Sequence, residues 1–420
     1  MPHLMPLGAI ADDVTGGTDL ASVLRQAGLT VVQTLGLPRA ALPTADAVVI
    51  SLKTRMASPA VAVGQAVAAA DALAGAGAAQ IYFKYCSTFD STDAGNIGPV
   101  IEGLLEALSV PFTVACPAYP GLGRTVYQGH LFVGSRLLSE SSMRHHPLTP
   151  MFDADLVRVL GRQTRHPVAL VPLADVDRGE GAVRARMSGL ADVGCRIAIV
   201  DAIFDAHVDT VAAACGDVRL VTGGAALGGA LGRRSVRGRR AVFTARPAPP
   251  PGDGRIVLSG SCSDATREQV RRLAAHVPSR ALEPVRLLEL PGELPGLIDW
   301  ALAQARRGSV LLYSTVRPET VSAVQARMGR AQAAALLEQA FGHIAAALAA
   351  DGARTFVVAG GETAGAVLNA LRIHTIAFDD DLEPGVPWAR SLDPEGFTFA
   401  LKSGNFGSPD FLLRAVSEAT

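Results

Sequence analysis

Two adjacent aspartates, Asp12 and Asp13, are the first residues in the chain that suit chemistry, because they follow the apolar run 7–11 and precede Gly16 and Gly17. Ligands of an open α/β sheet bind at the carboxyl ends of its strands, and the N-terminus of the following helix attracts anions. Consecutive side chains at a strand end point to opposite sides, so one aspartate can face a ligand while the other orients the turn. The alternative is that one aspartate caps the N-terminus of the following helix while the other is exposed to solvent.

Cationic residues close two further strands of the expected sheet. Lys84 ends the apolar strand 80–84. A buried lysine is costly unless paired, so Lys84 is a candidate partner for a substrate carboxylate or an aspartate. Arg55 follows the strand 48–52 and can bind a carboxylate through two parallel hydrogen bonds. Asp90 lies in the Ser/Thr-rich stretch after Lys84, which adds hydroxyl donors and one carboxylate. The alternative for Lys84 is a side chain that extends from the strand end to solvent.

Glycine-bearing turns in the last part of the chain suit phosphate binding. They contain Ser259 and Gly260, then Gly360 and Gly361, and finally Gly404. Glycine lets the backbone come close to a phosphate and offer it N–H donors. No GxxxxGK[ST] motif is present, and no GxGxxG stands between a strand and a helix. The residues therefore predict a nucleotide site of another kind, with tight helix–strand packing as the alternative role of these glycines.

These side chains need a frame of alternating strands and helices to meet. Short apolar runs alternate with Ala- and Leu-rich helical patterns, as in the strand 48–52, the helix 60–74 and the strand 80–84. Such alternation predicts βαβ units and a parallel sheet. We therefore expect an α/β protein whose two domains each hold a mainly parallel sheet flanked by helices.

A proline-rich segment divides the chain. Four prolines between 247 and 251 cannot lie in a helix or a central strand, so they indicate a stiff linker. The strand–turn–helix rhythm resumes after it. We predict an N-terminal domain over 1–244, a linker over 245–254 and a C-terminal domain over 255–420, each domain being large enough for its own core.

Composition excludes several classes of function. A net charge of −1 over 420 residues provides no field for polyanions or membranes, and 5% aromatic residues offer no stacking surface for nucleic acid. The five cysteines form no CxxC pair, so neither a disulfide framework nor a zinc site is indicated. No signal-peptide pattern opens the chain, which predicts a cytoplasmic protein.

The segment 119–150 is expected to cover the site or to form a subunit contact, which leaves a homo-oligomer open. It contains His145 and His146. Adjacent histidines without an acid or cysteine at ligand spacing are weak evidence for a metal. The sequence therefore names no metal ligands.

At these residues the chain resembles the four-carbon acid sugar kinases. Val14 stands where the family has Phe, and Gly17 where it usually has Ala, and both changes leave the polar groups intact. The run 129–151 is most similar to the branch that acts on 3-oxo-tetronate. The resemblance spans nearly the whole chain and is carried by the segments 10–16, 82–92, 123–133, 138–151, 360–363 and 402–407.

The resemblance implies an N-terminal domain for the acid sugar and a C-terminal domain for ATP. The implied reaction transfers the γ-phosphoryl group of ATP to the 4-hydroxyl of 3-oxo-tetronate, with D-threonate or D-erythronate as alternative acceptors. Mg²⁺ is expected to bridge the nucleotide phosphates. The family's nucleotide-contacting motifs match Ser259, Gly360, Gly361, Glu362, Thr363 and Gly404.

Phosphoryl transfer requires positioning, charge neutralisation and a base near the acceptor hydroxyl. For this chemistry Asp13 or Asp90 is the candidate base, and Asp12, Arg55 and Lys84 are the candidate ligands of the acid. A non-catalytic two-domain sensor of a small acid is the alternative from another class. An NAD-dependent hydroxy-acid dehydrogenase is disfavoured because GxGxxG is absent. ADP release that requires both the acid and Mg²⁺ separates a kinase from a sensor.

Overall fold

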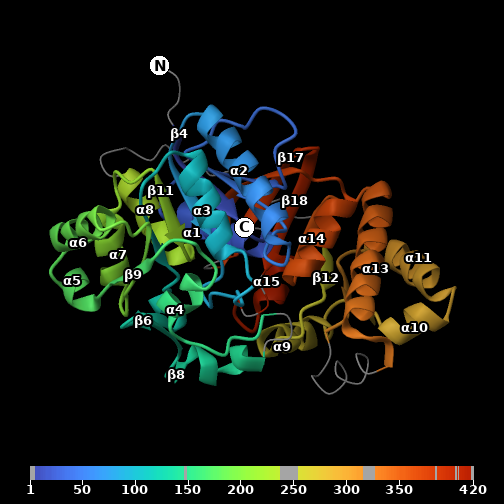
Figure 1. The fold of residues 1–420 in the computed structure, drawn as a ribbon. Helices are drawn as coiled ribbons and strands as arrows, with labels where there is room; N and C mark the ends of the chain where they lie inside the picture. Colours follow the sequence, from blue (N-terminus) through green and yellow to red (C-terminus); the bar gives the residue numbers. More distant parts are fainter. Residues whose placement is uncertain are drawn as a thin grey trace. The chain divides into compact units, whose positions relative to one another are not determined.

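The computed structural model divides the chain into two compact units, Met1–Phe243 and Thr244–Thr420, which we call unit 1 and unit 2 (Figure 1). The predicted linker lies almost entirely outside the described residues, so it stays a prediction. Each unit is an α/β layer structure with a largely parallel sheet, which confirms the predicted fold class. The structure describes residues 5–145, 149–236, 254–315, 327–383, 386–402, 404 and 406–417.

The sheet of unit 1 is parallel throughout, in the order β2–β3–β1–β4–β11–β5–β10–β9. Its central strands are apolar and buried along their length, as expected when helices cover both faces of a parallel sheet. The strands are β1 (Met5–Ala11), β2 (Val31–Leu35), β3 (Ala47–Ser51), β4 (Ala78–Lys84), β5 (Thr113–Cys116), β9 (Val168–Val171), β10 (Ile197–Val200) and β11 (Leu220–Gly223).

The helices of unit 1 pack in two groups: α1 and α7 contact α8, whereas α2 contacts α3. Asp13 caps the first of them, and Pro59 opens α2, where its missing N–H costs no hydrogen bond. The helices are α1 (Val14–Gln26), α2 (Pro59–Gly75), α3 (Ile97–Ala107), α4 (Leu156–Gly161), α5 (Leu173–Asp177), α6 (Glu180–Asp192), α7 (Asp205–Ala214) and α8 (Ala225–Ser235).

A small antiparallel sheet is inserted between β5 and β9. It consists of β6 (Arg124–Tyr127), β7 (His130–Val133) and β8 (Arg136–Leu137). The β6–β7 turn uses positive φ at both central residues, Gln128 and Gly129, as a two-residue hairpin requires. The Asp201 carboxylate, at the end of β10, accepts the N–H of each of them at 2.8 and 2.9 Å. The hairpin is thus fixed to the main sheet.

Unit 2 has a sheet in the order β13–β14–β12–β15–β18–β17–β16. It is parallel from β13 to β18 and antiparallel from β18 to β16. The antiparallel part was not anticipated. The strands are β12 (Ile256–Ser259), β13 (Ser279–Ala281), β14 (Val310–Tyr313), β15 (Thr355–Ala359), β16 (Thr375–Glu383), β17 (Val386–Asp393) and β18 (Glu395–Lys402).

The core of unit 2 lies between the sheet and the helices α9 and α15, where buried side chains such as Val257, Leu311, Val357 and Phe411 meet. Within α13, the stretch Gln332–Ala350 is long and apolar enough to cross a membrane, a criterion that core helices also meet. This helix packs on α14 and α11. The helices are α9 (Asp264–Leu273), α10 (Pro284–Glu289), α11 (Glu293–Ala305), α13 (Arg330–Ala350), α14 (Gly361–Ala370) and α15 (Phe411–Ser417).

Candidate functional site

Charged side chains gather in unit 1 where β1, β3 and β4 end. The register of the sheet sets Ala11 opposite both Ser51 and Lys84, so the three strands end side by side. The chain leaves β1 for β2 and β3 on one side and then crosses to β4 on the other, and such switch points are where ligands bind. We call the charged residues there the strand-end cluster: Asp12, Asp13, Asp19, Arg55 and Lys84.

Asp12 and Arg55 form a two-fold hydrogen-bonded ion pair. Arg55 Nε donates to Asp12 Oδ2 at 2.9 Å and Nη2 donates to Oδ1 at 2.8 Å. The Asp12 carbonyl oxygen also accepts the N–H of Thr54 and of Arg55. Asp12 is buried, so the interpretation of a solvated neighbour is wrong. The fork that we expected on a substrate carboxylate is occupied by a protein carboxylate, which leaves Nη1 of Arg55 without a protein partner among the described residues.

Asp13 begins α1 and also contacts the arginine. Its Oδ1 accepts the Gly16 N–H at 2.7 Å and lies 2.9 Å from Arg55 Nη2. The N-cap interpretation is therefore confirmed, and it does not exclude chemistry because one carboxylate oxygen carries both contacts. Burial raises the pKa of Asp13, against the lowering effect of the Arg55 and Lys84 charges.

Lys84 is buried at the end of β4, so the alternative of a side chain extended to solvent is wrong. Its Nζ donates to the Tyr85 carbonyl oxygen at 3.2 Å and lies 3.9 Å from Asp19 Oδ2. The ammonium group fits beneath α1 because Gly16 has no side chain: a Cβ there would lie 2.8 Å from Nζ. The glycine after the two aspartates thus makes room for the cation.

Asp90 lies beyond β4 and is linked to the cluster through electrostatics. Thr88 Oγ1 donates to Asp90 Oδ1 at 2.5 Å and lies 2.9 Å from the Cys86 sulfur. Burial, and next the Asp90 charge, raise the pKa of Cys86 to about 11, while the Arg55 and Lys84 charges oppose the rise. The thiol is therefore protonated at neutral pH, and Asp90 lies within electrostatic reach of the same region.

The glycine-bearing turns of unit 2 meet at the carboxyl ends of β12, β15 and β18. The register sets Ala359 opposite both Ser259 and Lys402. The N–H groups of Gly260 and Ser261 donate to the Ala359 carbonyl oxygen at 3.0 and 3.2 Å, and these bonds fix the turn after β12 against β15. The turns predicted to bind the nucleotide are thus neighbours, although Ser403 and Asn405 lie outside the described residues.

Glycine is required where these turns touch. A Cβ on Gly260 would lie 2.1 Å from Thr363 Oγ1, and one on Gly404 would lie 2.7 Å from Ser261 Oγ. Gly360 adopts a φ of 119° and caps α14, which is backbone that side chains disfavour. The N-terminus of α14, with Gly361 and the exposed Glu362 in its first turn, therefore opens beside the turn after β12.

Two further members of this site, Ser259 and Lys402, are both buried. Ser259 is fully buried, and its hydroxyl is shared with that of Thr315 at 2.8 Å. Lys402 ends β18 directly before the turn at Gly404, within the segment 402–407 that the sequence places at the nucleotide site. Its Nζ donates to the Gly404 carbonyl oxygen at 2.8 Å and to Thr266 Oγ1 at 2.9 Å. Burial lowers the pKa of Lys402 to about 8, so the group keeps most of its charge at pH 7.

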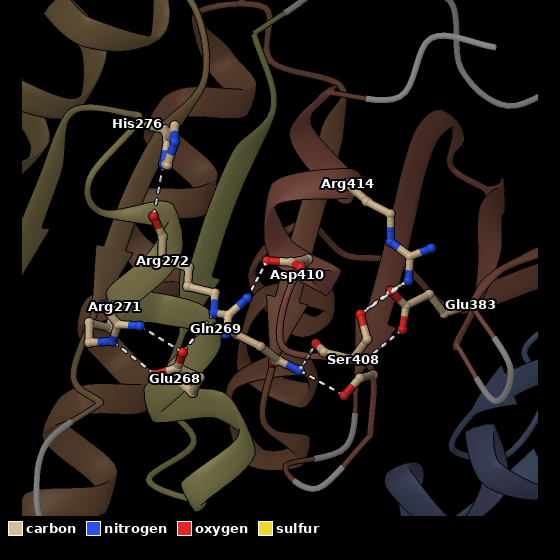
Figure 2. A network of polar contacts seen from close by, with 10 residues as sticks. Glu268, Gln269, Arg271, Arg272, His276, Glu383, Ser408, Asp410 and Arg414 are labelled. Carbon is tan, nitrogen blue, oxygen red and sulfur yellow. Dashed lines mark hydrogen bonds and ion pairs between the residues drawn. The ribbon is translucent and has the colours of Figure 1, made fainter.

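The chain that follows Gly404 is clamped from two sides (Figure 2). From α9, the buried Gln269 amide donates to the carbonyl oxygens of Phe406, Gly407 and Ser408 at 3.2, 3.0 and 2.8 Å. From β16, the buried Glu383 accepts the Ser408 N–H at 2.6 Å and pairs with Arg414. We call this arrangement the turn clamp, and it was not visible in the sequence because its members are distant in the chain.

Among the described residues, a surface hollow is present and a metal-ligand group is not. Within the ranges that the structure describes, no group of three histidine, cysteine or acidic residues could hold a metal ion. A surface hollow of about 520 Å³ lies at the amino ends of β5 and β11, lined by Val110, Phe112, Met187 and others. None of the predicted site residues lines it. His146 lies outside the described residues.

Two family models and several solved structures match this chain. Residues 7–231 match a family described as "Sugar-binding N-terminal domain", and residues 256–412 match one described as "Nucleotide-binding C-terminal domain". The chain is 40% identical to a solved structure from Salmonella typhimurium LT2, with a TM-score of 0.90 over 99% of this chain and 100% of that one. A solved Haemophilus influenzae protein is also 40% identical, with a TM-score of 0.82 over 97% and 98%.

Several curated relatives carry one name. A protein of Pseudomonas fluorescens named 3-oxo-tetronate kinase is 48% identical over 98% of this chain and 96% of its own length. Another protein of that name, from Burkholderia multivorans, is 48% identical over 98% of this chain and 96% of its own length. A third, from Salmonella typhimurium, is 42% identical over 99% of each chain.

Proposed function

The chain belongs to the four-carbon acid sugar kinase family, and on that premise we propose that it transfers the γ-phosphoryl group of ATP to the 4-hydroxyl of 3-oxo-tetronate. The observation that carries this is the near full-length similarity, at 42 to 48% identity, to relatives named 3-oxo-tetronate kinase. D-threonate, D-erythronate and a purely sensory role are disfavoured by the same names. The enzyme is thus a phosphotransferase that acts on an alcohol group of a carbohydrate acid.

The strand-end cluster is our candidate for the acid site. Arg55 Nη1 and the Lys84 ammonium are cations that can neutralise the substrate carboxylate, with Asp12 fixing the arginine. In the reaction the 4-hydroxyl oxygen forms a bond to the γ-phosphorus, the bond to the ADP oxygen breaks, and the hydroxyl proton moves to a carboxylate. We assign that proton to Asp13 or Asp90.

The turns of unit 2 are our candidate for the nucleotide site. Backbone N–H groups at the N-terminus of α14 suit a phosphate, and the tight contacts of Gly260 and Gly404 bring three strand ends close together. The proposed contacts are those that the family's motifs match: Ser259, Gly360, Gly361, Glu362, Thr363 and Gly404.

A direct test of this nucleotide assignment is Gly361→Val. A side chain there should block the phosphate, so ATP binding is lost while binding of the acid survives. Calorimetric titration of the folded variant with each ligand measures both. Normal ATP affinity would contradict the assignment, and general destabilisation with equal loss of both ligands would point to a packing role.

Mg²⁺ fits a site of this kind without dedicated protein ligands. It binds nucleotide phosphates and keeps several waters, so the protein needs few carboxylates for it. Glu362, exposed in the first turn of α14, is a carboxylate that could reach its waters. When bound, the ion would neutralise charge on the phosphates.

We also propose that the enzyme is cytoplasmic, that it binds neither nucleic acid nor membrane, and that it assembles as a homo-oligomer.

An ADP-release assay tests the function. We expect release with 3-oxo-tetronate that depends on both the acid and Mg²⁺, and slower release with D-threonate and D-erythronate. Formation of the 4-phosphate, followed by phosphorus NMR, identifies the acceptor hydroxyl. Saturable binding of the acid without ADP release would overturn the proposal in favour of a sensor. Faster turnover of D-threonate or D-erythronate would identify that acid, in place of 3-oxo-tetronate, as the substrate.

A further inference from the structure

Asp19 is the carboxylate of the strand-end cluster for which the proposed function gives no role. The other two have firm partners: Asp12 is bound twice by Arg55, and Asp13 caps α1. Among the described residues, the ionic contact of Asp19 is with Lys84 Nζ at 3.9 Å, which is too long for a hydrogen bond. A quarter of the Asp19 side chain (25%) is exposed, so the side chain is accessible to a ligand.

Lys84 and Asp19 present a donor and an acceptor side by side. Asp19 lies three residues after Gly16 on α1, which puts both on one face of the helix. Because Gly16 has no side chain, the Lys84 ammonium reaches this face from β4. Lys84 is buried, whereas Asp19 is partly exposed, so the pair has a polar edge toward solvent.

The charge of Asp19 also acts on Tyr119, in the segment that follows β5. Burial raises the pKa of Tyr119 to about 12, with the charges of Asp19 and then Asp205 adding to the rise. Burial raises the pKa of Asp19 itself, while the Lys84 charge lowers it and the Asp13 charge raises it. A partly desolvated carboxylate of this kind gains from a hydroxyl donor supplied by a ligand.

We infer that Lys84 and Asp19 together bind the 2-hydroxy carboxylate end of the acid, with Asp19 as a specificity-determining residue. A 2-hydroxy acid carries an anionic acceptor and a hydroxyl donor on adjacent carbons, which complements an ammonium beside a carboxylate. The carboxylate at C1 binds Lys84, and the C2 hydroxyl donates to Asp19. This inference rests on the proposed function, because it concerns the substrate of the same site.

The test compares two substrates in matched variants. The substrates are 3-oxo-tetronate and 4-hydroxy-3-oxobutanoate, which is the same acid without its 2-hydroxyl group. The proteins are the wild type, Asp19→Ala, Asp19→Asn and Asp71→Ala, the last an exposed aspartate on α2 as control. We expect the wild type and Asp71→Ala to prefer the hydroxylated acid about tenfold or more in kcat/KM, the effect of one hydrogen bond to a charged group.

In Asp19→Ala the preference should fall to within about threefold, because the acceptor is gone. Asp19→Asn retains a carbonyl acceptor, so its substrate preference should lie between those of the wild type and Asp19→Ala. The KM for ATP should stay within about twofold of the wild-type value in all variants. An unchanged substrate preference in Asp19→Ala overturns the inference, since a merely structural role would lower the turnover of both acids equally.

The proposed function can fail separately. If the wild type releases no ADP with any four-carbon acid, the kinase assignment is wrong, and the same four proteins are titrated with the two acids by calorimetry. A binding preference for the 2-hydroxy acid that disappears in Asp19→Ala then still supports the inference. A preference that Asp19 does not affect, or no binding of either acid, contradicts it.

Discussion

Asp12 and Asp13 are neighbours in the chain, yet their environments give them different capacities. Both carboxylate oxygens of Asp12 accept hydrogen bonds from Arg55, so Asp12 orients the guanidinium group. Neither oxygen is therefore well placed to accept a proton from the substrate. Asp13 uses one oxygen on the Gly16 N–H and on Arg55. Its other oxygen is the better candidate for proton transfer, which favours Asp13 over its neighbour in the proposed reaction.

Replacing the candidate bases one at a time is the sharpest test at this scale. Asn at position 13 keeps the size and the N-cap but loses basicity, so turnover should fall roughly 10²- to 10⁴-fold if Asp13 is the base. Asp90→Asn is the parallel variant, and its turnover should stay near that of the wild type in that case. If both variants retain turnover, the base lies elsewhere.

The raised pKa of Asp13 adds a pH test. A base must be ionised, so activity is lost as the pH falls through its pKa, and burial moves that pKa upward. The ordinary pKa of an aspartate is about 3.9. We therefore expect kcat to fall, on the acidic side of its pH profile, at a pH above that value. A fall at or below that value would contradict Asp13 as the base.

Arg55 carries the second residue-scale prediction. Arg55→Lys keeps the charge but loses the planar fork, so the KM for the acid should rise about tenfold or more while the KM for ATP stays near wild type. Steady-state kinetics with each substrate varied in turn measure this. Equal changes in the two KM values would indicate a general effect on folding, and an unchanged KM for the acid would remove Arg55 from the substrate site.

At the scale of elements, the site of unit 2 depends on helices and strands that hold turns from outside. Figure 2 shows Gln269 reaching from α9 to the carbonyl groups after Gly404, and Glu383 reaching from β16 to Ser408. The hydrophobic face of α9 places Gln269 in the interior, where the amide pairs carbonyl groups that the turn leaves unpaired. The turn clamp therefore couples the packing of α9 to the shape of the proposed nucleotide site.

Gln269→Leu tests that coupling. The carbonyl groups of the turn lose their donor, which should lower the free energy of unfolding by roughly 1–3 kcal/mol. The Gln269 Oε1 atom has no partner in the described part of the chain, so its removal costs nothing there. We expect the KM for ATP to rise and the KM for the acid to stay unchanged.

Glu268→Gln is the matched control for this variant. Glu268 precedes Gln269 on α9 but faces solvent, where it pairs with Arg271 and Arg272. Exposed ion pairs contribute little, so stability and both KM values should remain close to those of the wild type. Equal ATP affinity in Gln269→Leu and Glu268→Gln would show that the turn clamp has no effect on the nucleotide.

At the scale of the whole molecule, the two ligand sites are assigned to separate compact units. Strand ends of unit 1 carry the charged cluster, and strand ends of unit 2 carry the glycine turns. Each unit has its own strands, helices and buried core, so each can be stabilised by its own ligand. A kinase needs both ligands at once, and separate sites make their binding independently measurable.

Hydrogen exchange followed by mass spectrometry on the full chain checks this division. ATP should slow exchange at the turns after β12, β15 and β18, and the acid should slow exchange after β1, β3 and β4. At a ligand concentration 100 times Kd, the gain in stability is about 2.7 kcal/mol for the unit that binds. Protection by ATP confined to unit 1 would reverse the assignment of the two sites.

The sequence alone determined much of this protein. Apolar runs at βαβ spacing predicted the alternating strands and helices, because both types of element follow from local periodicity. The strand-end positions of Asp12, Arg55 and Lys84 followed as well, since parallel strands end at one edge of their sheet. The antiparallel strands β16 to β18 escaped prediction because their pairing depends on contacts between distant segments.

Tertiary structure decided how the site residues pair. Local sequence cannot say that Arg55 binds Asp12, that Lys84 lies beside Asp19, or that Gln269 holds the turn after Gly404. These contacts join positions 43, 65 and 138 residues apart, and burial selects them because a desolvated charge or amide needs a partner. The chain thus specifies where chemistry can occur, and packing specifies which side chains remain free to perform it.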